Sequence, residues 1–287
     1  MNNNPHQSSP IVGLTVPAEV GMHVDDIATP ALVIELNAFE RNVATLRRFV
    51  EQTGVRLRAH AKTHKSADIA RYQMEHGGAC GMCCQKVAEA EALVAGGVHD
   101  VMVSNQVVDL QKIDRLAALA SKARVQVCVD DLGNIADLSA AAVKHGTTLE
   151  VLVEIDCGAN RCGVQSSDTA LLLAQAIDSA QGLAFVGIQA YQGSAQHIYD
   201  YAERGAAIER AGAFTRETVG LLAQNGLKCE TVGGAGTGSY YFESASGVYN
   251  ELQCGSYVFM DADYAKVRDK SGAFISEFEH SLFILTS

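Results

Sequence analysis

The sequence predicts an α/β fold, a closed (β/α)8 barrel of the TIM type, and two observations support it. Short apolar runs recur about every 25 residues, and a segment with the periodicity of an amphipathic helix follows most of them, as in repeated βα units. The chain holds eight such runs, the number of parallel strands that closes this kind of barrel. An open doubly wound sheet stays as the alternative, because the sequence does not reveal the order of the strands.

The predicted strands are short and apolar, and glycine follows several of them. They cover residues 31–35, 56–62, 79–85, 100–105, 125–130, 149–155, 184–190 and 231–234. Segments of helix length separate them, and glycine often comes after the last helical residue, as is common at helix C-termini. The predicted helices cover residues 37–52, 67–76, 87–95, 110–121, 134–145, 168–179 and 201–225.

The barrel is predicted to occupy residues 29–273. Residues 1–28 show no clear periodicity and are expected to form an N-terminal arm. Residues 274–287 follow the eighth unit and contain the apolar run 282–285, which predicts a further strand. We expect this strand to be the beginning of an incomplete C-terminal β domain.

Composition and charge narrow the class of protein. The chain has 22 Lys and Arg residues against 33 Asp and Glu residues, which gives a formal net charge of −11. This acidic balance argues against a nucleic-acid partner, because phosphate binding requires a clustered basic surface. The N-terminal segment lacks the basic start and apolar core of a secretory signal, and no apolar run of about 18 residues could span a membrane. We therefore expect a cytoplasmic enzyme with a small-molecule substrate and no membrane partner.

The eight cysteines are expected to be reduced and buried. They are spread through a long chain without a secretory signal, where disulfides are uncommon. Cys80 and Cys83 have C-x-x-C spacing, but a structural zinc site usually needs a second pair or suitably spaced histidines, and neither is nearby. Cys157 and Cys162 flank a glycine loop and are interpreted in the same way.

Lys62 is the first candidate catalytic residue, because it lies at the end of the predicted strand 56–62. In a TIM barrel the strand ends carry the reactive groups. Burial and nearby cations there lower the pKa of a lysine, which makes its amine competent for Schiff-base formation. His60, Lys62 and His64 would share one face if the strand continues that far. A solvated basic strand end is the alternative interpretation.

Two further strand ends add complementary chemistry. The glycine-rich turn 233–239 contains two hydroxyls, and its N–H groups are suited to holding a phosphate, although a plain flexible turn is the alternative. It fits neither a P-loop nor a dinucleotide fingerprint. Arg161 follows the predicted strand 149–155 and could bind a cofactor's phenolic oxygen, a substrate carboxylate or Asp156. A lysine, a phosphate cradle and an arginine on three strand ends together predict pyridoxal phosphate.

Several short sequence motifs resemble those of a known family. The run 58–66, the loop 156–163 and the turn 233–239 resemble the signatures of the D-threonine aldolase and D-serine dehydratase family. The N-terminal domain of that family is a barrel of the alanine racemase type, fold type III, which binds pyridoxal phosphate. Within the family, four further motifs are most similar to those of the members that cleave 3-hydroxyaspartate. These motifs lie at 83–86, 189–193, 236–244 and 250–257.

The resemblance implies a role for each matching residue of the cofactor site. Lys62 would bind the cofactor covalently, while Gly236, Thr237 and Gly238 would hold its phosphate. Tyr257 matches a family tyrosine that faces the phosphate. The residues expected around the cofactor ring are Gln85, Arg161 and Tyr191.

The reaction that the resemblance implies is retro-aldol cleavage of the Cα–Cβ bond of a D-3-hydroxy amino acid. The expected substrate is 3-hydroxy-D-aspartate, which gives glycine and glyoxylate. The expected catalytic residues are Lys62 and two candidate proton shuttles, His64 and His197. A cation for the β-carboxylate of the substrate is expected from His60, Lys65 or Arg161.

The family also uses a divalent cation, Mg2+ or Mn2+. Its ligands are expected in the C-terminal domain, so we assign no metal ligand in this chain. Cleavage of D-threonine is one alternative activity, and dehydration of D-serine or 3-hydroxyaspartate on the same cofactor is another. A third alternative is a pyridoxal phosphate carrier without catalysis. We also expect the chain to form a homodimer.

Overall fold

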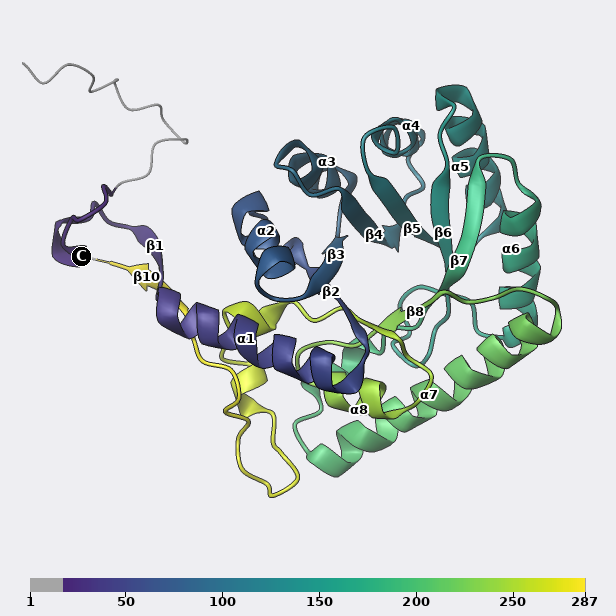
Figure 1. Cartoon of the computed structure of the whole chain (residues 1–287). Coiled ribbons are helices and arrows are strands. Elements are labelled where there is room, and N and C mark those ends of the chain that lie inside the picture. The colour runs from purple at the N-terminus through teal and green to yellow at the C-terminus, as the bar shows by residue number, and fades with distance from the viewer. Residues whose placement is uncertain (1–17, 287) are drawn as a thin grey trace, which may run out of the picture.

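The computed structural model describes residues 18–286, in which eight parallel strands close a barrel (Figure 1). Hydrogen-bonded neighbours follow the order β2 to β9, and β9 pairs in turn with β2. The strands are β2 (Arg56–His60), β3 (Ala79–Cys84), β4 (Asp100–Gln106), β5 (Arg124–Val129), β6 (Leu149–Glu154), β7 (Leu183–Gln189), β8 (Thr231–Gly234) and β9 (Glu251–Leu252). The predicted (β/α)8 barrel is confirmed, and the open sheet is excluded because this sheet closes on itself.

Helices surround the barrel (Figure 1). They are α1 (Leu36–Thr53), α2 (Ala67–Glu75), α3 (Val87–Ala95), α4 (Leu110–Leu119), α5 (Leu132–His145), α6 (Ser167–Ser179), α7 (Tyr201–Gln224) and α8 (Tyr240–Ala245). Side-chain caps explain several of their first residues, since Asp109 and Asp131 each accept a backbone N–H from the first turn that follows. Within residues 18–286, no helix is both long enough and apolar enough to cross a membrane.

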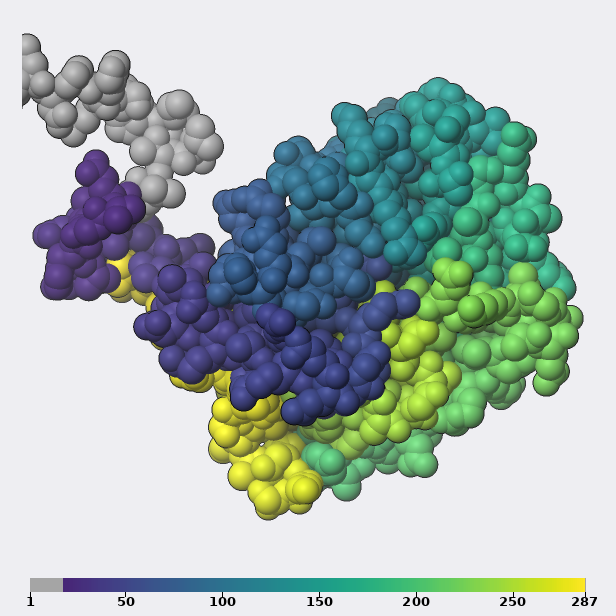
Figure 2. Space-filling view, viewed as in Figure 1, coloured from purple at the N-terminus to yellow at the C-terminus, as the bar shows by residue number. Residues whose placement is uncertain are grey.

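The first predicted strand lies outside the barrel, so its assignment as a barrel strand is wrong. β1 (Ala31–Ile34) pairs antiparallel with β10 (Leu282–Leu285), with Ala31 opposite Leu285. Figure 2 shows this pair, purple against yellow, projecting from the side of the molecule. Leu32 and Ile284 are 70% and 68% exposed, so these apolar residues do not contribute to the barrel core.

The eighth barrel strand is instead β9, which the sequence analysis missed. Glu251 lies opposite Arg56 of β2 and Gly233 of β8, so this short strand closes the ring. Two residues are too few to show a hydrophobic period, and one of them is charged. The predicted strand at 282–285 is present as β10. Residues 1–17 of the predicted arm lie outside the described residues, and the domain limits stay a prediction.

The inside of the barrel is closed below its mouth. Cys83, Met102, Cys128, Leu152 and Val186, one from each of five neighbouring strands, form a buried cluster. The strands begin at the opposite end, where a network of arginine and carboxylate side chains, centred on the buried Arg58 and Glu251, joins several of them. A functional site therefore has room at the carboxyl ends of the strands, as is usual in this fold.

All eight cysteines are free. Five are buried and two are half-buried, but Cys80 is exposed, so the prediction of uniformly buried thiols is wrong at this position. Cys80 is the second residue of β3 and falls at an irregularity of the β2–β3 pairing, where Leu57 lies opposite Ala79 and Arg58 opposite Gly81; its Sγ lies 3.7 Å from Glu251 Oε2.

Candidate functional site

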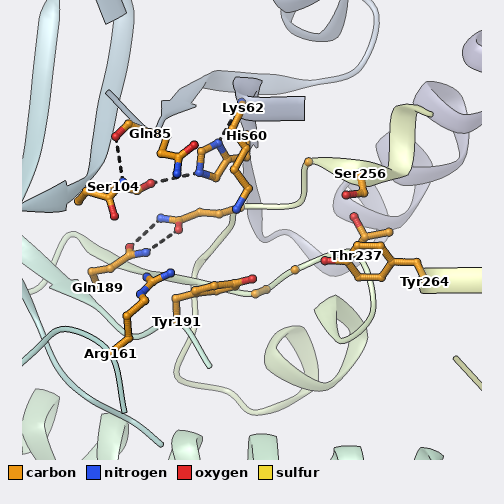
Figure 3. Close-up of a pocket in the computed structure, with 15 residues that line it drawn as sticks. His60, Lys62, Gln85, Ser104, Arg161, Gln189, Tyr191, Thr237, Ser256 and Tyr264 are labelled. Carbon is orange, nitrogen blue, oxygen red and sulfur yellow. Dashed lines mark hydrogen bonds between the residues drawn. The ribbon is translucent and has the colours of Figure 1, made fainter. Parts of the chain in front are cut away.

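A cavity opens at the carboxyl ends of the barrel strands (Figure 3). Its walls come from the carboxyl ends of seven of the eight strands and the segments that follow them, so residues far apart in sequence meet there. The lining residues are His60, Lys62, Gln85, Ser104, Asn105, Arg161, Gln189, Tyr191, Ala235, Gly236, Thr237, Gln253, Gly255, Ser256 and Tyr264.

Lys62 lies in the cavity wall, one turn beyond the end of β2. The strand stops at His60, and Ala61–Thr63 form a single 3-10 turn, η2. The strand does not continue to His64, so the condition under which His60, Lys62 and His64 would share one strand face is not met. Burial, with a contribution from the nearby charge of Arg161, lowers the pKa of the Lys62 amine. A larger share of this amine is neutral, and so nucleophilic, than of a lysine with the ordinary pKa.

His60 is a neutral neighbour of Lys62. Its Nδ1 accepts the Lys62 backbone N–H at 3.3 Å, so the ring proton is assigned to Nε2, which lies 3.2 Å from Ser104 Oγ. Burial, followed by the charges of Lys62 and other basic residues, lowers the pKa of His60 to about 3. The imidazole carries no charge near neutral pH, so the expectation that His60 could supply a cation is wrong.

Three other basic residues of the sequence analysis lie outside the cavity lining. His64 turns toward α2, where its Nε2 lies 3.0 Å from Gln73 Oε1. Lys65 forms an ion pair with Glu89. His197 belongs to the 3-10 turn η3 (Gly193–His197) and is largely exposed, with its Nδ1 2.8 Å from Asp263 Oδ2. The structure does not bring these side chains together with Lys62.

Arg161 reaches the cavity from the loop after β6. Its guanidinium carbon lies 5.6 Å from the centre of the Tyr191 ring, and Nη2 lies 3.6 Å from Glu154 Oε1. The alternative pairing with Asp156 is wrong, because Asp156 Oδ1 instead accepts two backbone N–H groups of its own loop. The Arg161 side chain is half-exposed, so it keeps donors available for an anion in the cavity.

Two glutamines pair across the cavity floor. Gln189 and Gln253 exchange two amide hydrogen bonds, of 2.7 Å and 2.8 Å (Figure 3). Gln253 also lies 3.6 Å from Met102 Sδ, which places the floor directly on the buried cluster of the barrel. The sequence analysis missed Ser104, Gln253 and Tyr264 as lining residues. Ser104 could have been found from its place near a predicted strand end, whereas Gln253 follows the unpredicted β9.

The predicted phosphate turn faces the cavity with part of its backbone. The N–H groups of Thr237 and Gly255 have no hydrogen-bond partner within residues 18–286, whereas the Gly238 N–H is bound to Gln196 Oε1. Thr237 Oγ1 accepts the Tyr257 backbone N–H at 3.1 Å. The cavity therefore offers free N–H donors at Thr237 and Gly255, while Gly238 helps to shape the turn.

Tyr257 contributes to the turn from behind. Its side chain is fully buried, and its hydroxyl oxygen accepts a hydrogen bond from Gln73 Nε2 at 2.9 Å. The structure therefore places the Tyr257 hydroxyl away from the residues that line the cavity, and its backbone N–H is the group that supports Thr237.

Comparison with known proteins agrees with this arrangement. Residues 34–263 match the family described as alanine racemase, N-terminal domain. The chain belongs to this family.

Similar proteins of the alanine racemase-like family include two curated aldolases. The 3-hydroxy-D-aspartate aldolase of Paracoccus denitrificans (strain Pd 1222) is 52% identical over 279 residues, which are 96% of this chain and 72% of that protein. The D-threonine aldolase of an Arthrobacter species is 42% identical over 276 residues, with the same coverage of both chains. A crystal structure of D-threonine aldolase from Filomicrobium marinum superposes with a TM-score of 0.91 at 50% identity, covering 94% of this chain and 72% of that one. Carbon–carbon lyases are thus close relatives of this chain.

The alanine racemase-like barrel implies pyridoxal phosphate, and the residues present fit this group. Lys62 offers a partly neutral amine, Arg161 and Tyr191 lie side by side in the wall, and Thr237 and Gly255 offer free N–H donors. A divalent metal ion fits less well. Residues 18–286 contain no group of three His, Cys, Asp or Glu side chains placed to bind one, and we derive no step through a metal ion.

Proposed function

We propose that this protein is a pyridoxal phosphate-dependent lyase that cleaves D-3-hydroxy amino acids between Cα and Cβ. The proposed substrate is 3-hydroxy-D-aspartate, and the products are glycine and glyoxylate. The observation that carries the proposal is Lys62, an amine in the cavity wall whose pKa is lowered by desolvation and which shares this cavity with an arginine and backbone donors.

Lys62 would hold the cofactor through its amine, and Thr237 and Gly255 would bind the phosphate. Arg161, Tyr191 and Gln85 would surround the ring. When bound, the cofactor supplies an electron sink for the electron pair that is released when the Cα–Cβ bond breaks.

The side chains of the cavity limit which groups can move protons. Burial raises the pKa of Tyr191 to about 12 and raises that of Tyr264 further, so both hydroxyls keep their protons near neutral pH and act as hydrogen-bond donors. His60 is a weak base, because its pKa is lowered to about 3. The Lys62 amine, when it is not bound to the cofactor, would be the remaining cavity group with a neutral, basic form, so we assign proton exchange at the substrate to Lys62 Nζ.

Arg161 is the proposed site for the β-carboxylate of the substrate. Hydroxyaspartate carries this carboxylate, whereas threonine has a methyl group at the same place. Lys62 and Arg161 are the two cationic side chains of the lining, and Lys62 is committed to the cofactor. A guanidinium is suited to bind a carboxylate through two parallel hydrogen bonds.

The proposal is tested with the purified protein and pyridoxal phosphate. The wild type should show the visible absorbance of a lysine-bound cofactor, and Lys62→Ala should lose it. Incubation with D-3-hydroxyaspartate, D-threonine or D-serine, with added Mn2+ or Mg2+ because the family resemblance implies a metal ion, should give glycine and glyoxylate from the first substrate. Ammonia and a keto acid would instead identify a dehydratase.

Binding of the cofactor without turnover of any of these substrates would favour a carrier, and failure of the wild type to bind the cofactor would refute the proposal. We further propose that the protein acts in the cytoplasm as a homodimer on a small D-amino acid. Light scattering that gives the mass of one chain would contradict the dimer.

A further inference from the structure

A buried carboxyl group lies behind the phosphate turn, outside the cavity lining. Glu243 of α8 is 1% exposed. Its Oε1 accepts a hydrogen bond from Ser239 Oγ at 2.8 Å, and its Oε2 has no hydrogen-bond partner among the described residues. Buried polar atoms without a partner are uncommon in proteins, and an ionised carboxylate in such a place is costly.

A one-way chain of hydrogen bonds connects the turn to this carboxyl group. Gln196 Oε1 accepts the Gly238 N–H at 2.9 Å, so the amide nitrogen of Gln196 faces Ser239 and donates to its Oγ at 2.6 Å. Because Ser239 Oγ accepts this hydrogen bond, its own hydrogen points to Glu243. All three side chains are buried. Glu243 is thus the final acceptor of a chain that begins at the phosphate turn.

Burial raises the pKa of Glu243 to about 7, against the opposing effects of the Ser239 hydrogen bond and the charge of Arg204. Arg204 of α7 donates through its two terminal nitrogens to the carbonyl oxygens of Ile198 and Arg268, while its buried Nε, like Glu243 Oε2, has no hydrogen-bond partner among the described residues.

The other ionisable groups that interact with Glu243 remain neutral near pH 7. Burial raises the pKa of each of these thiols and phenols, which are Cys157, Tyr191, Tyr249 and Cys254. Within this set, Glu243 is the group whose charge changes around neutral pH.

We propose that protonated Glu243 is a positioning residue that holds the turn 236–239 in its phosphate-binding shape through Ser239 and Gln196. This inference rests on the proposed pyridoxal phosphate site. An ionised Glu243 places a negative charge behind the phosphate, and the two charges repel across a dry interior. By linkage, a bound phosphate raises the pKa of Glu243, so binding near neutral pH takes up a proton at this side chain.

The experiment measures the affinity of the apoprotein for pyridoxal phosphate from pH 6 to pH 8. All variants carry Lys62→Ala, which removes the covalent bond and the titration of the amine. Glu243→Gln is the variant that stays neutral, and it reports the titration of the phosphate itself. Relative to it, the affinity of the parent should fall about tenfold between pH 6 and pH 8, as expected for one group with a pKa of about 7.

Two further variants complete the comparison. Ser239→Ala removes the central hydroxyl and should weaken binding at least about tenfold at every pH. Glu217→Gln is the matched control, because the Glu217 carboxylate also accepts a serine hydroxyl, that of Ser167 at 3.0 Å, but lies on the outer helix α7. Its pH profile should follow that of the parent.

A second measurement needs no change at Glu243. Calorimetric titration of the Lys62→Ala protein at pH 7 in two buffers of different ionisation enthalpy should show uptake of about half a proton for each cofactor bound. Equal pH profiles for the parent and Glu243→Gln, or binding without proton uptake, would overturn the inference. Failure of the wild type, with Lys62 present, to bind any cofactor would instead refute the proposed function.

Discussion

Replacing Arg58 with methionine is expected to lower the free energy of unfolding by about 3 kcal/mol. Arg58 of β2 is buried at the amino-terminal end of the barrel, where its Nε lies 2.9 Å from Glu251 Oε1 and its Nη1 pairs with Asp100. Burial alone would lower the pKa of the guanidinium, yet the two carboxylates raise it above its usual value. The ion pairs therefore outweigh the desolvation of the charge.

The size of this loss in unfolding free energy depends on which arginine partners Glu251 and Asp100 retain after the substitution. Removing one partner of a buried ion pair costs about 3–5 kcal/mol, because the other charge is left uncompensated. Glu251 retains Arg56, whose Nε is 3.3 Å away, and Asp100 retains Arg124 at 3.2 Å. Both remaining arginines are only partly buried, so they compensate in part, and we expect the lower end of this range.

The assay is equilibrium unfolding in urea, followed by circular dichroism and by tyrosine fluorescence, since the chain has no tryptophan. The control is Arg47→Met, because Arg47 pairs with Glu51 on the exposed face of α1 and should cost less than about 1 kcal/mol. A double mutant of Arg58→Met with Glu251→Gln should be less destabilised than the sum of the two single variants. Strict additivity, or a cost for Arg58→Met as small as that of the control, would refute this account of the barrel floor.

Three other predictions follow from the site and the strands. Arg161→Gln should lower kcat/KM for D-3-hydroxyaspartate about 10- to 100-fold and change that for D-threonine far less; equal losses would show that Arg161 serves the cofactor. Gly187→Ala should prevent normal pairing of β7 with β8, because φ is +144° at Gly187 and a Cβ there would lie 1.8 Å from the Thr231 carbonyl oxygen. The control is Gly220→Ala on α7, where a Cβ meets open space; in the same unfolding assay it should be neutral or stabilising. Burial lowers the pKa of His64 in the folded protein to about 4, from an ordinary value of 6.5. As the pH drops, the unfolded chain therefore binds a proton at His64 before the folded protein does. The free energy of unfolding falls between about pH 6.5 and pH 4. His64→Gln should reduce this fall by up to about 1.4 kcal/mol per pH unit, and an unchanged slope would contradict a neutral, half-buried His64.

The alternation of short apolar runs with helical segments was enough to predict the barrel, because each barrel strand longer than three residues and each covering helix except the six-residue α8, which the sequence analysis missed, has its own local period. The position of Lys62 near a strand end, the glycine turn and the loop of Arg161 were also visible, since strand ends in a barrel converge on one face. Those local signals identified Lys62, Arg161, Gly236 and Thr237, and the family resemblance added Gln85 and Tyr191; all six line the cavity.

The sequence by itself determined the fold class and the segments that carry the chemistry, because both depend on patterns within short stretches of chain. Only the tertiary structure decided that β9 closes the barrel and that β1 pairs with β10, since pairing between strands more than 190 residues apart leaves no local pattern. It also decided that His60 is neutral and that Glu243 lies behind the phosphate turn. Burial and hydrogen bonding set the charge of a side chain, and both arise from neighbours that folding brings together.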